Sequence, residues 1–417
     1  MSRDRTLSDD RGMVRAGMAL FFANAGFALL TFILNFIVAR RLGPAGYGVF
    51  GTVTALLFLF SALFPSLVMA VARVVAADGG TPPGTLRGIT YWSLAAAAML
   101  IALAGPLQAY LRLPRRDHLY LVAGFLFLSA LLSALRGVLE GLQRFYMLAL
   151  NIAGEGIFRL LTGGVLLVLG YEIGGVLLAY LLATIGAIGL FLPARSRGLT
   201  AAPAVGRQRH ALARFFLPVL LTHVLIELLT NLDMVMIRHG LSEMATGRYT
   251  VLFTAGKFML FGAGAAATVM FPKVVTAAAG RQRTAPVFHQ GMLLTLGLGA
   301  GLTAGAWWFG APVIGVLFGP EFTGAAPLLA PYCLLMTLFC LAFYGFKVML
   351  AIGRYRFLIL PAAAVLIETL LLRDVSSGLS AAITRLSWLA GGMTAIILVW
   401  TGIAVHRLDH PGAREGA

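Results

Sequence analysis

The stretch NFIVARRLGPAGYGVF, residues 35–50, decides the fold, because a weaker echo of it returns about two hundred residues later. The echo is NLDMVMIRHGLSEMATGRYTVLF, residues 231–253. Each copy ends an apolar run with a basic, glycine-containing hinge and then begins another apolar run near a tyrosine. The matching positions are Arg41 and Arg238, Gly43 and Gly240, and Tyr47 and Tyr249. Two such hairpins predict two related half-molecules that face each other, and such repeat interfaces in membrane proteins commonly hold a substrate pathway.

The composition indicates a polytopic membrane protein. Hydrophobic residues make up 59% of the chain and charged residues 12%, whereas soluble domains average about 25% charged residues. About 20 apolar residues cross the hydrocarbon core, and they do so as a helix because backbone groups in lipid need internal hydrogen bonds. Twelve such runs are present, at residues 16–38, 46–70, 89–107, 118–136, 149–169, 173–193, 215–237, 249–271, 287–308, 325–346, 356–372 and 383–404. The predicted fold class is an all-α polytopic membrane protein with about twelve transmembrane helices in two pseudo-symmetric six-helix lobes.

The net charge of +16 is interpreted as an orientation signal, so no nucleic-acid partner is expected. With both chain ends in the cytoplasm, 21 Lys and Arg residues fall inside and nine outside, while Arg159 and Lys257 fall within spans. This excess is what the positive-inside rule expects. The inside charges are also predicted to contact anionic membrane lipids. Residues 1–15 precede a span that has no cleavage site, so that span is predicted to be an uncleaved signal anchor.

The longest polar connection, residues 194–214, divides the chain into two. It contains five arginines and has no apolar periodicity, so we expect a cytoplasmic linker. Residues 1–193 then form an N-terminal six-helix lobe and residues 215–417 a C-terminal one. Because six is even, both lobes begin inside, and the repeats are expected to be parallel, related by an axis along the membrane normal.

Several motifs together resemble one family of membrane proteins. They are Ala39–Pro44 with Tyr47, Gly48 and Phe50; Gly137–Asn151; Asn231-Leu232-Asp233; Phe271-Pro272; and the turn Phe318–Phe322. On these residues the chain resembles the oligosaccharide flippase, or polysaccharide biosynthesis protein, family of the multidrug/oligosaccharidyl-lipid/polysaccharide exporter superfamily. The resemblance covers roughly residues 14–360. It departs at residues 371–385, LLRDVSSGLSAAITR, where members often carry a different, glycine- and tyrosine-containing motif.

The resemblance implies a transporter rather than an enzyme. The expected activity is movement of an undecaprenyl-diphosphate-linked oligosaccharide from the inner to the outer leaflet by alternating access. The expected location is the bacterial inner membrane, with both termini cytoplasmic. The expected partners are the lipid-linked glycan, membrane lipids and glycan-synthesis enzymes, and no cofactor or metal is implied.

Ionisable side chains inside spans are costly, so each is a candidate substrate-binding residue. Lys257 suits a phosphate as a point charge, and the alternative is that it extends to the outer interface. Glu155 and Arg159 lie four residues apart on one helical face, and the alternative is a self-neutralising structural pair. Arg41 is expected at the outer interface, where it either fixes the hairpin or meets substrate. Asn231 completes this set.

Ion coupling is predicted for a second set of residues. His223, Glu227 and Asn231 form an i, i+4, i+8 stripe on the seventh span, and Asp233 follows. A buried carboxylate or histidine can take up a proton, and the alternative is hydrogen bonding between helices. Glu368, in the eleventh span, is a further candidate.

Two other functions stay open. A cation-coupled drug antiporter of the same superfamily needs a central carboxylate, which Glu227 or Asp233 can supply. A membrane enzyme acting on the same glycans usually needs a sizeable outer loop, whereas the outer connections near 108–117 and 238–248 are short. A basic lumen, with Lys257 and Arg159, repels cationic drugs and so favours the flippase over the antiporter.

Overall fold

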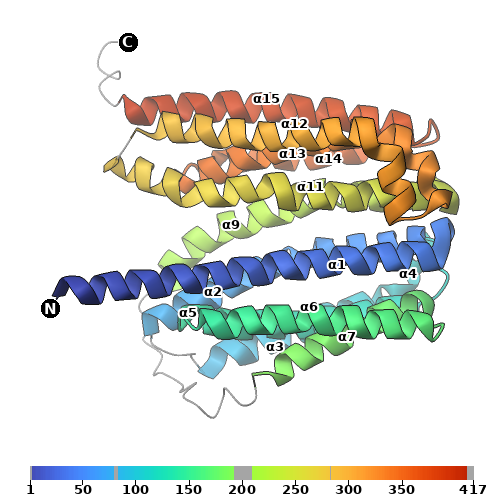
Figure 1. Cartoon of the computed structure of the whole chain (residues 1–417), viewed down its shortest axis with the longest axis horizontal. Helices are drawn as coiled ribbons and strands as arrows, with labels where there is room; N and C mark the ends of the chain where they lie inside the picture. The colour runs from blue at the N-terminus through green and yellow to red at the C-terminus, as the bar shows by residue number, and fades with distance from the viewer. Residues whose placement is uncertain (1, 79–82, 192–208, 282, 411–417) are drawn as a thin grey trace. The chain divides into compact units, whose positions relative to one another are not determined.

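The computed structural model describes residues 2–78, 83–191, 209–281 and 283–410, which are helical with short connections and contain no strand (Figure 1). The first half contains α1 (Ser2–Ser61), α2 (Leu63–Asp78), α3 (Pro83–Ala102), α4 (Ala104–Tyr110), α5 (Asp117–Gly141), α6 (Phe145–Val168) and α7 (Glu172–Gly189). The second contains α9 (Arg209–Leu229), α10 (Leu232–Gly240), α11 (Glu243–Thr276), α12 (Thr284–Leu317), α13 (Ala326–Ala351), α14 (Ile359–Leu371) and α15 (Leu379–Asp409). Short η2 (Ala277–Arg281), η3 (Pro320–Ala325) and η4 (Tyr355–Leu358) join some of them.

The helices confirm a multi-pass membrane protein. Among the described residues, eight helical stretches are long and apolar enough to cross a membrane, or nine if the bent pair Leu86–Ala102 and Ala104–Tyr110 is one span. One stretch, Arg15–Ala77, is 63 residues long and contains two of the predicted runs. The predicted runs overlap helices, but the runs 46–70, 89–107 and 215–237 are each divided between two helices, and α14 has only 13 residues. The number twelve and the cytoplasmic position of the termini therefore stay predictions.

The predicted first hinge is a kink inside α1. Gly43 has φ 63° and ψ −177°, a non-helical conformation that divides α1 into two arms. A positive φ is readily adopted by glycine alone. Pro44, which lacks a backbone N–H, begins the second arm at a position where no helical hydrogen bond is needed. The hinge therefore forms where the sequence pattern predicts it.

The chain divides into two compact units. Unit 1 comprises Met1–Leu42 and Phe60–Phe216, and unit 2 comprises Gly43–Leu59 and Leu217–Ala417. The segment Gly43–Leu59, which we call the inserted segment, thus packs with unit 2, although it precedes residue 193. The predicted linker, 194–214, lies mostly outside the described residues, and its last six residues already belong to α9. The two-lobe division by sequence stays a prediction.

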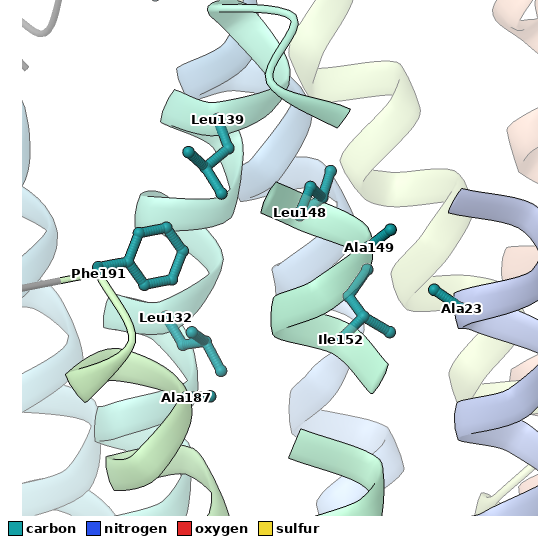
Figure 2. Close-up of a cluster of buried hydrophobic side chains, with 8 residues drawn as sticks. All are labelled: Ala23, Leu132, Leu139, Leu148, Ala149, Ile152, Ala187 and Phe191. Carbon is teal, nitrogen blue, oxygen red and sulfur yellow. The ribbon is translucent and has the colours of Figure 1, made fainter. Parts of the chain in front are cut away.

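Unit 1 is held together by glycines and an apolar cluster. A Cβ atom at Gly137 of α5 would lie 2.6 Å from the Val68 carbonyl oxygen of α2, so these helices touch through their backbones. A Cβ atom at Gly156 of α6 would lie 3.1 Å from the Phe27 ring in the first arm of α1. Figure 2 shows the apolar cluster that α1, α5, α6 and the end of α7 share. Its buried residues are Ala23, Leu132, Leu139, Leu148, Ala149, Ile152, Ala187 and Phe191.

Unit 2 is built around α13, which packs against α11, α12 and α15. Its side chains are mostly buried, and the Tyr344 hydroxyl donates to the Phe288 carbonyl of α12 at 3.0 Å. Asp409, at the end of α15, accepts the backbone N–H groups of Thr284 and Ala285, both at 2.8 Å. A carboxylate at this place satisfies N–H groups that a helix start leaves unpaired.

The two echoing hairpins meet in unit 2. A Cβ atom at Gly48 would lie 2.9 Å from the Gly247 nitrogen, and one at Gly247 would collide with Pro44. Gly51 likewise lies against Thr250. We call Gly48, Gly51, Gly247 and Thr250 the glycine seam. Because no seam residue is larger than threonine, the backbones of the inserted segment and α11 are in contact there.

Candidate functional site

Unit 1 contains a buried charged cluster formed by Arg136, Asn151, Glu155 and Arg159, here called the arginine–glutamate cluster. Arg136 donates to Glu155 at 2.6 Å and to the Asn151 side-chain oxygen at 2.9 Å. Arg159 also donates to Glu155. The Asn151 amide donates to the Ala187 carbonyl oxygen at 2.8 Å. The Glu155–Arg159 pair, which the sequence offered as the alternative to a substrate-binding role, is present, and a second arginine joins it.

Aromatic rings enclose the Arg159 guanidinium. Its central carbon lies 4.4 Å from the Tyr180 ring centroid, 4.9 Å from that of Phe27 and 5.8 Å from that of Phe125. Arginine stacks favourably on aromatic faces because its charge is delocalised and weakly hydrated. Its Nε, also buried, has no hydrogen-bond partner among the described residues. Arg159 is therefore held in place but keeps one unused donor.

Two cations share one carboxylate in this cluster. Helical spacing places Asn151, Glu155 and Arg159 at i, i+4 and i+8 on one face of α6. Arg136 reaches them from α5. In the sequence, Arg136 is one of the 21 inside charges, at the end of the fourth apolar run. Its side chain is 19% exposed, whereas that of Glu155 is 4% exposed. The cluster therefore carries one excess positive charge.

Unit 2 contains a broken helix where the seventh span was predicted. The span Leu217–Gly240 consists of α9 and α10, separated at Thr230 and Asn231. Asn231 has φ −141° and ψ −18°, outside the helical region. Its amide donates to the Glu227 carbonyl oxygen and to a Glu227 carboxylate oxygen, both at 2.7 Å. Asn231 thus satisfies backbone and side-chain acceptors at the break, and breaks of this kind often form binding sites in transporters.

Lys257 of α11 lies beside this break. Its ammonium nitrogen is 3.8 Å from a Glu227 carboxylate oxygen and 3.4 Å from the Thr230 hydroxyl. It also lies 4.5 Å from the Phe58 ring centroid and 5.0 Å from that of Phe253. The side chain is buried within unit 2, so the alternative of an extended, exposed Lys257 does not hold there. We call Glu227, Asn231 and Lys257 the lysine–carboxylate cluster.

Two further carboxylates lie near this cluster. Asp233, in the first turn of α10, accepts the Tyr249 hydroxyl at 2.6 Å and the Tyr332 hydroxyl at 3.4 Å. Glu368 of α14 is fully buried, and neither carboxylate oxygen has a hydrogen-bond partner among the described residues. Its helix, α14, packs against α10, which carries Asp233. The three carboxylates predicted for ion coupling, Glu227, Asp233 and Glu368, thus lie in one unit, on α9, α10 and α14, and their role in coupling stays a prediction.

The remaining predicted residues lie elsewhere. His223 is half-buried on α9, and its Nδ1 is 3.0 Å from the Val219 carbonyl oxygen of the same helix. Arg41 is exposed at the end of the first arm of α1. The position that echoes it, Arg238, is buried and pairs with Glu243 at 3.1 Å. The hairpins are thus alike in position but not in the surroundings of their arginines.

The structure adds residues that the sequence did not single out. Tyr249 and Tyr332 hold Asp233 and pack edge to face, with ring centroids 5.6 Å apart. Phe58 and Phe253 flank Lys257. In the sequence, Tyr249 stood out only as the tyrosine of the second hairpin, and nothing indicated that it contacts Asp233. The others are aromatic residues in apolar runs, where nothing distinguishes them from lipid-facing residues.

No protein-family model and no curated protein sequence matches the chain. Solved structures do. An inward-facing multidrug resistance MATE family transporter of the MOP superfamily has a TM-score of 0.75 at 14% identity, over 93% of this chain and 96% of that chain. The lipid II flippase MurJ, in an inward closed conformation, has a TM-score of 0.66 at 14% identity, over 95% and 90%.

A third similar structure is a MOP superfamily transporter from Pyrococcus furiosus, described by the reverse polarity of its binding pocket. It has a TM-score of 0.63 at 15% identity, over 95% of this chain and 96% of that chain. At these identities the likeness concerns the fold. It agrees with the superfamily that the hairpin motifs resemble. The chain has the fold of the MOP superfamily transporters.

Proposed function

We propose that the protein is a flippase that moves an undecaprenyl-diphosphate-linked oligosaccharide from the inner to the outer leaflet by alternating access. The observation that carries this proposal is the excess positive charge of the arginine–glutamate cluster. Arg136 and Arg159 share Glu155, so one guanidinium charge is left for an anion. The similarity in fold to a structure named as a lipid II flippase supports the same substrate class.

A diphosphate crossing hydrocarbon needs compensating cations. Arginine offers two parallel N–H donors to phosphate oxygens, and lysine offers a point charge. Arg136 is the only member of its cluster that is not almost fully buried, so it is the residue that an anion reaches first. Lys257 is the second candidate cation, and it is released for substrate only if it leaves Glu227.

Energy for transport is proposed to come from an ion gradient or the membrane potential. The sequence contains no phosphate-binding loop of the ATPase type. Asp233, Glu368 and Glu227 are the proposed coupling groups, with His223 on the same helix as Glu227. We expect no catalytic chemistry, and we expect glycan-synthesis enzymes and membrane lipids of the bacterial inner membrane to be the working partners.

The second candidate is a cation-coupled drug antiporter. Unit 2 favours it, because Asp233 and Glu368 are both buried on the neighbouring helices α10 and α14, and neither forms a salt bridge among the described residues. A MATE transporter shares the fold. The two functions differ in which unit binds the substrate. The flippase uses the arginine–glutamate cluster of unit 1, and the antiporter uses Asp233 and Glu368 of unit 2.

The test uses Arg136→Gln in liposomes that contain a fluorescent undecaprenyl-diphosphate sugar. This change removes the excess charge and leaves the Glu155–Arg159 pair intact. Because a hydrogen bond to a charged group contributes about 1.5–3 kcal/mol, flipping should fall about 10- to 100-fold. Loss of protection from an external glycosidase measures it. The matched control is Arg115→Gln, an exposed arginine paired with Asp117, which should flip lipid at the unmodified rate.

Equal flipping by Arg136→Gln and the unmodified protein contradicts the proposal. So does an absence of flipping by the unmodified protein with several different glycans. Efflux of a cationic dye, measured with the same vesicles, then decides whether the antiporter replaces it.

A further inference from the structure

The inserted segment reaches from the glycine seam to Lys257. At its start, Gly48 and Gly51 lie against α11. In the same part of the segment the Tyr47 hydroxyl lies 2.8 Å from the Thr254 hydroxyl. At its end, the Phe58 ring lies beside that of Phe253, with centroids 6.4 Å apart. One short helical arm therefore joins the second hairpin to the candidate site.

Lys257 is held between two kinds of partner. On one side are the Glu227 carboxylate and the Thr230 hydroxyl. On the other are the faces of Phe58 and Phe253, and Phe58 is the closer ring. An ammonium over an aromatic face is attracted to it, most strongly where water is excluded. Of these four partners, only Phe58 belongs to the inserted segment, and the others lie on α9, α11 or the break between α9 and α10.

The glycine seam is a contact that depends on close approach. Its residues are small, so the two backbones lie in direct contact. A methyl group added at Gly247 would collide with Pro44 and therefore forces the inserted segment to shift. Gly247 is ten residues from Lys257 on the continuous helix α11, about 15 Å along the axis. A change at Gly247 therefore reaches Lys257 only through the position of the inserted segment or through α11 itself.

We propose that Phe58 is a positioning residue that makes the availability of Lys257 depend on the seating of the inserted segment. With the segment seated, the Phe58 ring holds the ammonium on Glu227 and away from an anion. With the segment displaced, the ring leaves and Lys257 is free to meet an anionic headgroup. This role for Lys257 rests on the proposed function, whereas the dependence on the inserted segment does not.

The experiment measures the reactivity of Lys257 in the purified full-length protein without substrate. Acetic anhydride modifies accessible amines, and mass spectrometry gives the modified fraction at Lys257 relative to exposed Lys273. We expect Phe58→Leu to raise this ratio about five- to thirty-fold, the range that loss of a desolvated cation–aromatic contact implies. Phe58→Tyr keeps the ring and should retain the low ratio.

The remote variant Gly247→Ala should raise the ratio as Phe58→Leu does. In the double variant Gly247→Ala with Phe58→Leu, the ratio should be no more than about twofold above that of either single variant, because both changes remove the same contact. Tyr47→Phe, which removes the hydroxyl bond to Thr254 without adding an atom, should raise it less. It keeps the test usable if Gly247→Ala fails to fold. Phe288→Leu, in a second apolar cluster that α11, α12, α13 and α15 share, is the control and should leave the ratio unchanged.

An unchanged ratio in Phe58→Leu overturns the proposal, as does an unchanged ratio in both Gly247→Ala and Tyr47→Phe. Equal rises in Phe58→Leu and Phe58→Tyr also overturn it, because they show that the ring face is not what holds the lysine. If reactivity responds as expected but Lys257→Gln flips lipid normally, the proposed function of Lys257 fails while the coupling stands.

Discussion

The arginine–glutamate cluster of unit 1 and the lysine–carboxylate cluster of unit 2 bury charge in opposite ways. In unit 1, two cations share one carboxylate between unbroken helices, and hydrogen bonds or aromatic faces surround them. In unit 2, one cation, Lys257, lies beside Glu227 at a broken helix, and the buried carboxylates Asp233 and Glu368 lie on α10 and α14 of the same unit. The difference teaches that a positive site and buried carboxylates can occupy separate units of one chain.

The two units also differ in how completely the buried charged groups are paired or hydrogen-bonded. Glu155 accepts from two arginines. Glu368 accepts from no described residue, and Lys257 stands 3.8 Å from Glu227, longer than a hydrogen bond. Unit 1 is therefore expected to contribute stability through its charges, and unit 2 to hold charges that change partners. Four substitutions test this contrast.

The largest effect is expected for Glu155→Gln. It leaves Arg136 and Arg159 without an anionic partner, and breaking a buried pair costs about 3–5 kcal/mol. Thermal unfolding in detergent should show a large fall in Tm. Asp117→Asn, which breaks the exposed pair with Arg115, is the control and should leave Tm unchanged. Equal shifts in the two variants would remove the special status of the unit 1 cluster.

A smaller effect is expected for Tyr249→Phe. The change removes the hydroxyl that donates to Asp233 at 2.6 Å, and a hydrogen bond to a charged group contributes about 1.5–3 kcal/mol. Tyr332→Phe removes a longer contact of 3.4 Å and should lower Tm less. Thermal unfolding of both variants measures the difference. The reverse order would show that Tyr332 is the main partner of Asp233.

Lys257→Met should destabilise the protein less than Glu155→Gln does. Glu227, left without its cation, is 29% exposed and keeps the Asn231 amide, so the cost is about 1 kcal/mol. The double variant Lys257→Met with Glu227→Gln should recover most of the lost Tm. A loss as large as that of Glu155→Gln would mean that unit 2 depends on its ion pair as much as unit 1 does.

The smallest effect on stability is expected for Glu368→Gln. Glutamine has the same size, and no hydrogen bond to a described residue is lost. The free energy of unfolding should change by less than about 1 kcal/mol, within the usual range for volume-conserving changes. If Glu368 couples transport to an ion, the dependence of flipping on a pH or sodium gradient should nevertheless disappear. A large fall in Tm would identify Glu368 as a structural carboxylate instead.

Local patterns predicted much of the fold and part of the site. Apolar length predicted where the helices lie, and the basic, glycine-containing hinge at Arg41-Leu42-Gly43 predicted the kink. The i, i+4 spacing predicted the Glu155–Arg159 pair, because both residues lie on one helix. Hydrophobicity alone was insufficient for the number of spans, since one apolar stretch runs through the kink and α14 is short.

Contacts between distant helices could not be predicted in this way. Arg136 joins Glu155 from α5, and Lys257 meets Glu227 from α11. The inserted segment packs with unit 2 although its sequence lies in the first half of the chain. The repeated hairpins predicted two related partners, but not that small residues would bring them into backbone contact. Such contacts depend on which helices become neighbours, and periodicity along one helix carries no information about that.

The most direct test measures two substrates in one set of vesicles: flipping of the fluorescent undecaprenyl-diphosphate sugar and efflux of a cationic dye. The variants are Arg136→Gln in the basic cluster and Asp233→Asn among the carboxylates. The account predicts that the unmodified protein flips the lipid and that Arg136→Gln slows flipping about 10- to 100-fold. Two results together would contradict the account. The first is dye efflux by the unmodified protein that Asp233→Asn abolishes. The second is lipid flipping that is absent or that proceeds at the same rate in Arg136→Gln.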